Sequence, residues 1–208
     1  MSDNEIVKEV LRELKKNEFN AYYAQNGDEA RKLVLEMIPE GASVGIGGSL
    51  TIRNLGLVEA LRQKGYKIYD HWDETLTPEE LKQTFRNQRT CDVFLCSTNA
   101  ITRDGQLINL DGSGNRVSSM IFGPQKIIVV AGINKIVENV EQGIHRVKNV
   151  VAPENYRRRN SPAPCAKTGH CIDCRPPAKQ CRALVILEAR PRISADFNVV
   201  LVGEELGI

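Results

Sequence analysis

Apolar side chains recur at two different spacings along this chain, and the two spacings alternate. Near the start, Ile6 and Val7, then Val10 and Leu11, then Leu14 recur at intervals of three or four residues, which places them on one face of a helix over 3–17. The same spacing predicts helices over 27–38, 50–64, 77–87 and 137–148. Short apolar runs rich in β-branched residues predict strands over 43–46, 67–69, 92–97, 126–130, 184–188 and 197–202. Strands that alternate with helices of this length predict an α/β fold, with a mainly parallel sheet flanked by helices.

The regular pattern stops in residues 152–182. This segment holds five of the nine prolines, four of the six cysteines and seven Lys or Arg against two acids, and it shows neither period. We interpret it as a Cys/Pro-rich insertion before the last two strands of a single domain that covers residues 1–208. An unstructured loop of this length is uncommon in a compact domain, so the insertion indicates a function or a structural staple.

Composition and charge exclude several classes of protein. A chain of 208 residues that is 41% hydrophobic and 26% charged is globular in composition, and its net charge of +2 is too small for a nucleic-acid binder. No apolar run approaches the length that spans a bilayer, so we expect no membrane segment. The first residues are acidic and lack the apolar core of a signal peptide, which favours a cytoplasmic location.

Two polar loops follow predicted strands. Residues 98–117 combine a strand exit, a turn at Asp104-Gly105, a short strand and the loop Asp-Gly-Ser-Gly-Asn at 111–115. Upstream, residues 45–49 read Gly-Ile-Gly-Gly-Ser between a strand and a helix. Loops at the carboxyl ends of parallel strands are where open α/β folds bind ligands, so together the two loops predict a small-molecule site.

Each loop also has a simpler interpretation. The glycine loop fits neither the dinucleotide pattern nor a phosphate-binding loop that ends in Lys-Ser/Thr. Its simpler interpretation is a tight strand-to-helix turn that binds no ligand. Asp104-Gly105 and Asp111-Gly112 are both common turn formers. For Asp104-Gly105 we favour the turn, and for residues 111–116 we favour the site.

The combination of these motifs resembles a known family. Gly-Gly-Ser-x-Thr at 47–51, Asn-Ala-Ile-Thr-x-Asp-Gly at 99–105, Asp-Gly-x-Gly-Asn-Arg-Val at 111–117 and the tail at 151–156 are similar to the LUD (lactate-utilisation) domain family. That family lies within the superfamily of ribose-5-phosphate isomerase, glucosamine-6-phosphate deaminase and CoA transferases, and the resemblance spans residues 5 to 205. It implies an open Rossmann-like fold and a role in bacterial lactate utilisation, as a subunit or accessory of an iron–sulfur lactate-oxidising system. One departure is Asn54, where members often carry an acid.

The ligand-binding residues that we predict come from both loops. Gly47, Gly48, Ser49 and Thr51 are expected to hold a small anionic group, phosphate or carboxylate. The facing wall is expected to consist of Asn99, Asp104, Asn109, Asp111, Gly112, Gly114, Asn115 and Arg116. Arg116 is the predicted partner of a carboxylate, because a guanidinium can hold a carboxylate through two hydrogen bonds.

The four clustered cysteines form the second candidate site. Cys165, Cys171, Cys174 and Cys181 fall within seventeen residues, with a Cys-x-x-Cys pair at the centre. Four thiolates suit a [4Fe–4S] cluster or a zinc ion, while disulfides or free thiols remain as alternatives. The other two cysteines, Cys91 and Cys96, lie at or beside a predicted strand and are interpreted as buried apolar residues.

The leading hypothesis is a LUD-family protein of L-lactate oxidation that binds a small anion and passes electrons to iron–sulfur or redox partners through a metal-bearing insertion. One alternative is a stand-alone enzyme similar to the sugar-phosphate isomerases or CoA transferases, although neither loop carries the Glu that a CoA transferase needs. The third hypothesis is a scaffold that zinc staples together and that performs no chemistry of its own. Homodimerisation is a default expectation rather than an inference from any residue.

Overall fold

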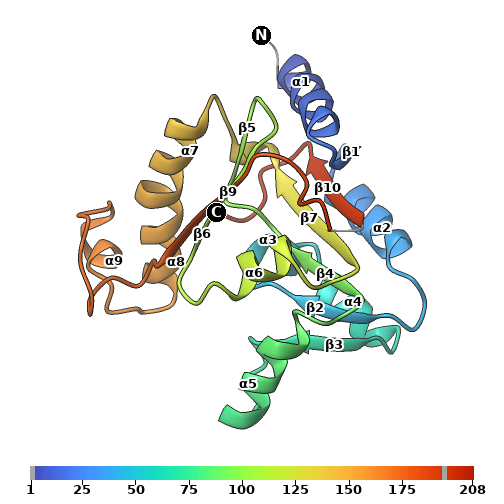
Figure 1. The fold of residues 1–208 in the computed structure, drawn as a ribbon, viewed down its shortest axis with the longest axis horizontal. Coiled ribbons are helices and arrows are strands. Elements are labelled where there is room, and N and C mark those ends of the chain that lie inside the picture. Colours follow the sequence, from blue (N-terminus) through green and yellow to red (C-terminus); the bar gives the residue numbers. More distant parts are fainter. Residues whose placement is uncertain (1–2, 194–195) are drawn as a thin grey trace.

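The fold is built on two sheets, and a computed structural model describes residues 3–193 and 196–208 (Figure 1). The main sheet has six parallel strands in the order β1 (Asn20–Ala24), β10 (Asp196–Val202), β7 (Lys126–Gly132), β4 (Val93–Cys96), β2 (Ser43–Ile46) and β3 (Lys67–Asp70). The small mixed sheet has the order β8 (Ile136–Val137), β5 (Ala100–Thr102), β6 (Leu107–Asp111) and β9 (Ala183–Leu187). The predicted α/β fold with a mainly parallel sheet is confirmed.

Both faces of the main sheet are buried, which explains the continuous apolar strands. In β4, Val93 and Leu95 pack on one side while Phe94 and Cys96 pack on the other. The first side is covered by α2 (Gly27–Met37), α3 (Leu50–Asn54) and α4 (Leu57–Gln63). The second side is covered by α1 (Asp3–Lys16) together with apolar residues of the small sheet. Cys91 and Cys96 are buried as predicted, and burial raises the pKa of these thiols to about 11 and about 12.

Most predicted elements are present with small shifts at their ends. Helix α5 (Pro78–Asn87) begins after Thr77, whose side chain and Glu80 form the reciprocal capping box. The helix predicted over 50–64 is instead two helices, because Gly56 between them adopts a left-handed conformation at φ 62°. Strand β1 and helix α6 (Asn115–Ile121) were not predicted.

The largest difference lies where the insertion was predicted to begin. Helix α7 (Val140–Arg146) continues through a π-helical turn, Val147–Val151, into α8 (Ala152–Arg158), so the first seven residues of the predicted insertion are helical. Pro153 lacks the N–H that a regular helix needs, and the wider turn before it accommodates that loss. A short helix, α9 (Pro164–Thr168), follows. Among the described residues, no helix is long and apolar enough to cross a membrane.

Candidate functional site

The carboxyl ends of the central strands open into one pocket. Its volume is about 540 Å³, and its wall contains the glycine loop after β2, the loops after β4 and β6, and α8. Strands β2, β4 and β7 are neighbours in the sheet, so the segments that follow them emerge side by side. The two loops singled out in the sequence therefore do face the same cavity.

The glycine loop forms one wall with two aromatic rings from the end of β3. A Cβ on Gly48 would lie 2.9 Å from Trp72 Nε1 and 3.1 Å from His71 Nε2, so only glycine fits there without displacing the rings. The Gln88 amide nitrogen lies 2.9 Å from His71 Nδ1 and also donates to Ile46 O and Tyr69 O, which ties the His71 ring to the ends of β2 and β3. Burial lowers the pKa of His71 and keeps the ring neutral. The Nε1–H of Trp72 and the Nε2 edge of the His71 ring therefore converge on the backbone of Gly48.

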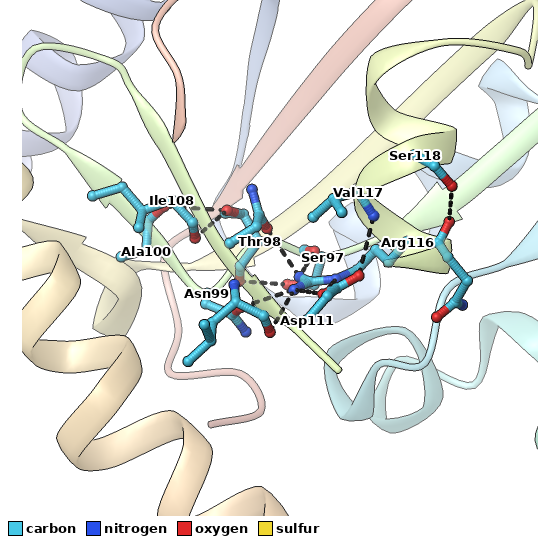
Figure 2. Close-up of polar contacts among 12 residues, drawn as sticks. Ser97, Thr98, Asn99, Ala100, Ile108, Asp111, Arg116, Val117 and Ser118 are labelled. Carbon is cyan, nitrogen blue, oxygen red and sulfur yellow. Dashed lines mark hydrogen bonds and ion pairs between the residues drawn. The ribbon is translucent and has the colours of Figure 1, made fainter. Parts of the chain in front are cut away.

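A buried ion pair organises the opposite wall (Figure 2). Arg116 in α6 is paired with Asp111 at the end of β6, where Nη2 and Nε donate to Asp111 Oδ1 at 2.6 and 3.0 Å. Its remaining N–H groups donate to Ser97 O, Asn109 Oδ1 and Asn99 Oδ1 at 2.8–2.9 Å. Asp111 Oδ2 also accepts from the N–H of Val117. All five donors of Arg116 are thus used within the chain, so the structure gives it the role of holding the loop in shape rather than that of a free carboxylate partner.

Lys135 is a second buried cation on the pocket wall. It ends the short 3-10 helix Ile133–Lys135 that follows β7, and its Nζ donates to Thr51 Oγ1 and to Ser97 Oγ, each at 2.9 Å. Burial, and then the positive charges of Arg146 and Arg116, lower the pKa of this amine from its usual 10.5 to about 7. Within the described part of the chain, no carboxylate lies within ion-pair distance of Lys135.

The rim adds further positive charge from α8 and from the segment before β9. Arg158, Arg159 and Arg182 line the pocket, and the guanidinium of Arg158 lies 5.1 Å from the centre of the Trp72 ring. Like Lys135, none of the three forms an ion pair with a described acid. The one acidic side chain among the described lining residues is Asp111, which Arg116 neutralises. The pocket therefore has a clear excess of positive charge.

The predicted ligand-binding residues divide into two groups. Those that line the pocket are Gly48, Ser49, Thr51, Asn99, Asp111, Gly112, Asn115 and Arg116. Gly47 and Asn109 lie behind the wall, where Gly47 packs under Cys96 and Asn109 accepts from Arg116. Gly114 precedes α6 in a left-handed conformation.

Asp104 lies away from the pocket. It is in the β5–β6 turn against α1, where its carbonyl accepts from Asn17. This is the turn-forming role that we favoured for Asp104-Gly105. Asn54 is exposed and also lies off the pocket, so the departure from the family pattern there does not alter its lining.

Sequence reasoning missed several residues of the site. Lys135 carried a usable signal, because it lies three residues beyond an apolar parallel strand, as the two polar loops do. His71 and Trp72 follow β3 in the same way but show no local motif. Tyr156, Arg158 and Arg159 enter the pocket only because α8 continues past Pro153, which reads as a helix breaker.

The cysteine-rich segment packs against this pocket. The Arg182 N–H donates to Asp111 O at 2.8 Å, and Gln180 lines the wall. Burial raises the pKa of the Cys165 thiol, and the neighbouring charges of Cys181, Cys174 and Cys171 raise it further, so the four sulfur atoms share one neighbourhood. All six cysteines are free thiols. Within residues 3–193 and 196–208, no three His, Cys, Asp or Glu side chains meet closely enough to hold a metal ion.

Comparison with known proteins places the fold and the family. A solved structure of a DUF162 family protein from Deinococcus radiodurans matches with a TM-score of 0.60 and 14% identity, over 98% of this chain and 99% of that one. At that identity, the match shows the shared fold. No curated protein matches the sequence. Residues 7–202 match the LUD domain, which is associated with lactate utilisation. The chain therefore belongs to the LUD domain family.

Proposed function

We propose that this chain binds a small carboxylate or phosphate anion in the pocket above Lys135, and that it acts in L-lactate utilisation as an accessory or subunit of a lactate-oxidising system. The observation that carries the anion-binding proposal is the excess of positive charge. Lys135, Arg158, Arg159 and Arg182 face the cavity, and none of them pairs with an acid among the described residues. A concave site lined by charge of one sign concentrates ligands of the opposite sign.

Neutral donors in the same pocket supply direction for such a ligand. The Nε1–H of Trp72 and the Nε2 edge of the His71 ring converge at Gly48, whose lack of a side chain leaves space beside them. Oxygen atoms of a carboxylate or phosphate are the acceptors that suit such N–H groups. The lactate pathway, to which the family is assigned, supplies the carboxylate candidates L-lactate and pyruvate.

Calorimetric titration tests the anion-binding proposal. We expect saturable binding of L-lactate, pyruvate or inorganic phosphate, weakened about tenfold or more in the double variant Arg158→Gln/Arg159→Gln, since each lost charge removes up to about 1 kcal/mol. Arg157→Gln is the matched control, because Arg157 lies on the same helix, is exposed and pairs with Glu154 outside the pocket. The proposal would be refuted if none of the three anions showed saturable binding.

The cysteine-rich segment supports a second candidate function, electron transfer. We propose that Cys165, Cys171, Cys174 and Cys181 hold a [4Fe–4S] cluster or a zinc ion. The donor set fits either group, because four thiolates are the usual ligands of both. The N–H of Asp173 donates to Cys171 Sγ at 3.4 Å, so this sulfur already accepts a backbone hydrogen bond. An iron–sulfur cluster would let the chain exchange electrons with a redox partner, whereas zinc would act as a structural staple.

Anaerobic purification with analysis for iron, sulfide and zinc separates these outcomes. Stoichiometric iron and sulfide that are lost in Cys171→Ser would support an electron-transfer component with iron–sulfur partners. Zinc alone would support the staple and leave the anion pocket as the functional site. Cys91→Ser is the control, because Cys91 is buried beneath the main sheet and away from the cluster. Neither metal in the wild-type protein would contradict the proposed centre.

A further inference from the structure

Two hydroxyl groups are the hydrogen-bond acceptors of the Lys135 amine. Its Nζ donates to the hydroxyls of Thr51 and Ser97, each at 2.9 Å. Both hydroxyls donate onward at 3.2 Å, Thr51 to Leu206 O and Ser97 to Thr98 O. Because a hydroxyl carries a single proton, neither can also donate to the amine. The two N–H bonds of a neutral amine are therefore held in place, while its lone pair meets no described donor.

The surroundings of Lys135 favour that neutral form. The residue is buried, with an exposed fraction of 3%, and the largest charge effects on it come from the cations Arg146 and Arg116. These effects lower the pKa of the amine to about 7, so a large share of it is unprotonated at neutral pH. A lysine made neutral by burial and by neighbouring cations is a nucleophile toward carbonyl carbon.

We propose that Lys135 forms an imine with a carbonyl compound that carries a carboxylate or a phosphate. The inference rests on the proposed anion binding, which it extends by assigning the class of ligand. The arginines of the rim would hold the anionic group, and Nζ at the base of the same pocket would meet the carbonyl carbon. Thr51 and Ser97 position the amine without taking part in the new bond.

The reaction is a condensation without oxidation or reduction. The Nζ lone pair forms a C–N bond as the carbonyl π electrons move to oxygen, and proton transfer from nitrogen to oxygen gives a neutral carbinolamine. Loss of the hydroxyl with the remaining amine proton, as water, leaves the C=N bond. Overall, one amine and one carbonyl compound give one imine and one water, so no co-reactant is required.

Reductive trapping tests the proposal on the full chain. The protein is incubated at neutral pH with sodium cyanoborohydride and pyruvate, dihydroxyacetone phosphate or the neutral analogue hydroxyacetone, and the adduct is located by intact-mass analysis and peptide mapping. We expect a single adduct at Lys135, formed at least about tenfold faster with an anionic probe than with hydroxyacetone, because the cationic pocket raises the local concentration of anions. The relative rates with pyruvate and dihydroxyacetone phosphate distinguish a carboxylate from a phosphate ligand.

Two lysine variants make the result specific. Lys135→Met should lose the adduct, whereas Lys126→Met should keep it, because Lys126 pairs with Asp196 at 3.1 Å and lies outside the pocket. An equal adduct in Lys135→Met, or no adduct in the wild-type protein, would overturn the inference. Titration with L-lactate, which has no ketone or aldehyde, separates the two proposals. Binding of lactate without trapping refutes the imine alone, and failure of both refutes the anion site as well.

Discussion

Arg116 and Lys135 are both buried cations on the wall of one pocket, but their partners differ. Every N–H group of Arg116 has an acceptor within the chain, and its charge is balanced by Asp111. Lys135 has two hydroxyl acceptors and no described acid. A fully satisfied buried ion pair fixes a structure, whereas a buried cation without a counter-ion is costly unless a ligand or deprotonation relieves it. Arg116 therefore has a structural role, whereas Lys135 is the side chain that can react with a ligand.

The largest expected effect comes from breaking the satisfied pair. Arg116→Met leaves Asp111 buried without its cation, so we expect the free energy of unfolding to fall by about 3–5 kcal/mol in urea denaturation. Arg62→Gln is the control, because the Arg62 side chain is 49% exposed and lies 3.6 Å from Asp70, which keeps its closer partner Arg53 at 2.7 Å. The loss of this half-exposed arginine is expected to cost less than about 1 kcal/mol. Equal losses in the two variants would show that the Arg116 network is not structural.

Replacing Lys135 should instead raise the free energy of unfolding. Lys135→Met removes a buried amine whose lowered pKa costs up to about 4 kcal/mol at pH 7, so we expect a gain in stability of about 1–4 kcal/mol after the loss of its two hydrogen bonds. The native pKa lies near 7 and the unfolded value near 10.5, so between these values the unfolded chain holds the extra proton and wild-type stability rises with pH.

The advantage of Lys135→Met over the wild type should therefore shrink steadily from pH 7 to pH 10.5 and stay constant below pH 7. Urea midpoints of the two proteins across this range measure the effect, and the comparison cancels the titration of groups that they share. A constant difference over the whole range would show that Lys135 is not depressed in the native state.

A substitution in the glycine loop can change the pocket wall without replacing Arg116 or Lys135. Gly48→Ala places a Cβ against Trp72 Nε1 and His71 Nε2, so anion affinity should fall about tenfold as the donors move, with a stability loss of about 1–2 kcal/mol from crowding. Gly45→Ala is the matched control. Its Cβ would lie 2.8 Å from Cys91 Sγ, outside the pocket, so it should lose stability and keep anion binding. If Gly48→Ala and Gly45→Ala bind the anion with equal affinity, the ring groups beside Gly48 do not contact the anion.

The smallest effect concerns a single donor. Trp72→Phe removes the indole N–H but keeps an aromatic ring beneath Arg53 and Arg158, so anion affinity should fall by about 1 kcal/mol, or roughly fivefold, with little change in stability. Tyr69→Phe serves as the control, because Tyr69 does not line the pocket. Unchanged affinity in Trp72→Phe would show that the indole N–H does not contact the anion.

The sequence predicts those features that depend on local pattern. Apolar periodicity located most strands and helices, and the rule that ligands bind at strand ends brought the glycine loop and residues 98–117 to one site. Features that depend on tertiary contacts were beyond it. Nothing local shows that Arg116 uses all of its donors inside the chain, because its acceptors come from β4, β6 and the loops beside them. A single lysine after β7 likewise shows no motif until Thr51 and Ser97 are placed beside it.

Two errors in the elements have clear physical causes. Gly56 interrupts a continuous apolar pattern, because its left-handed conformation turns the chain while both halves still face the core. The irregular segment was predicted to begin at residue 152, just before Pro153, but the π-helical turn there lets the helix continue. The second error mattered for function, because it removed the arginines of α8 from the predicted site.

The most direct test of the account is the pKa of Lys135 with and without an anion. Carbon-13 NMR of protein labelled at the lysine Cε, with the Lys135→Met variant used to assign the signal, follows the titration of this amine. We predict a midpoint near 7 in the free protein, since burial and the charges of Arg146 and Arg116 oppose protonation. Saturating phosphate should raise that midpoint, because a bound anion supplies the missing counter-charge. A midpoint near 10.5 that phosphate leaves unchanged would contradict the claim that Lys135 is a buried amine without a counter-charge until an anion binds.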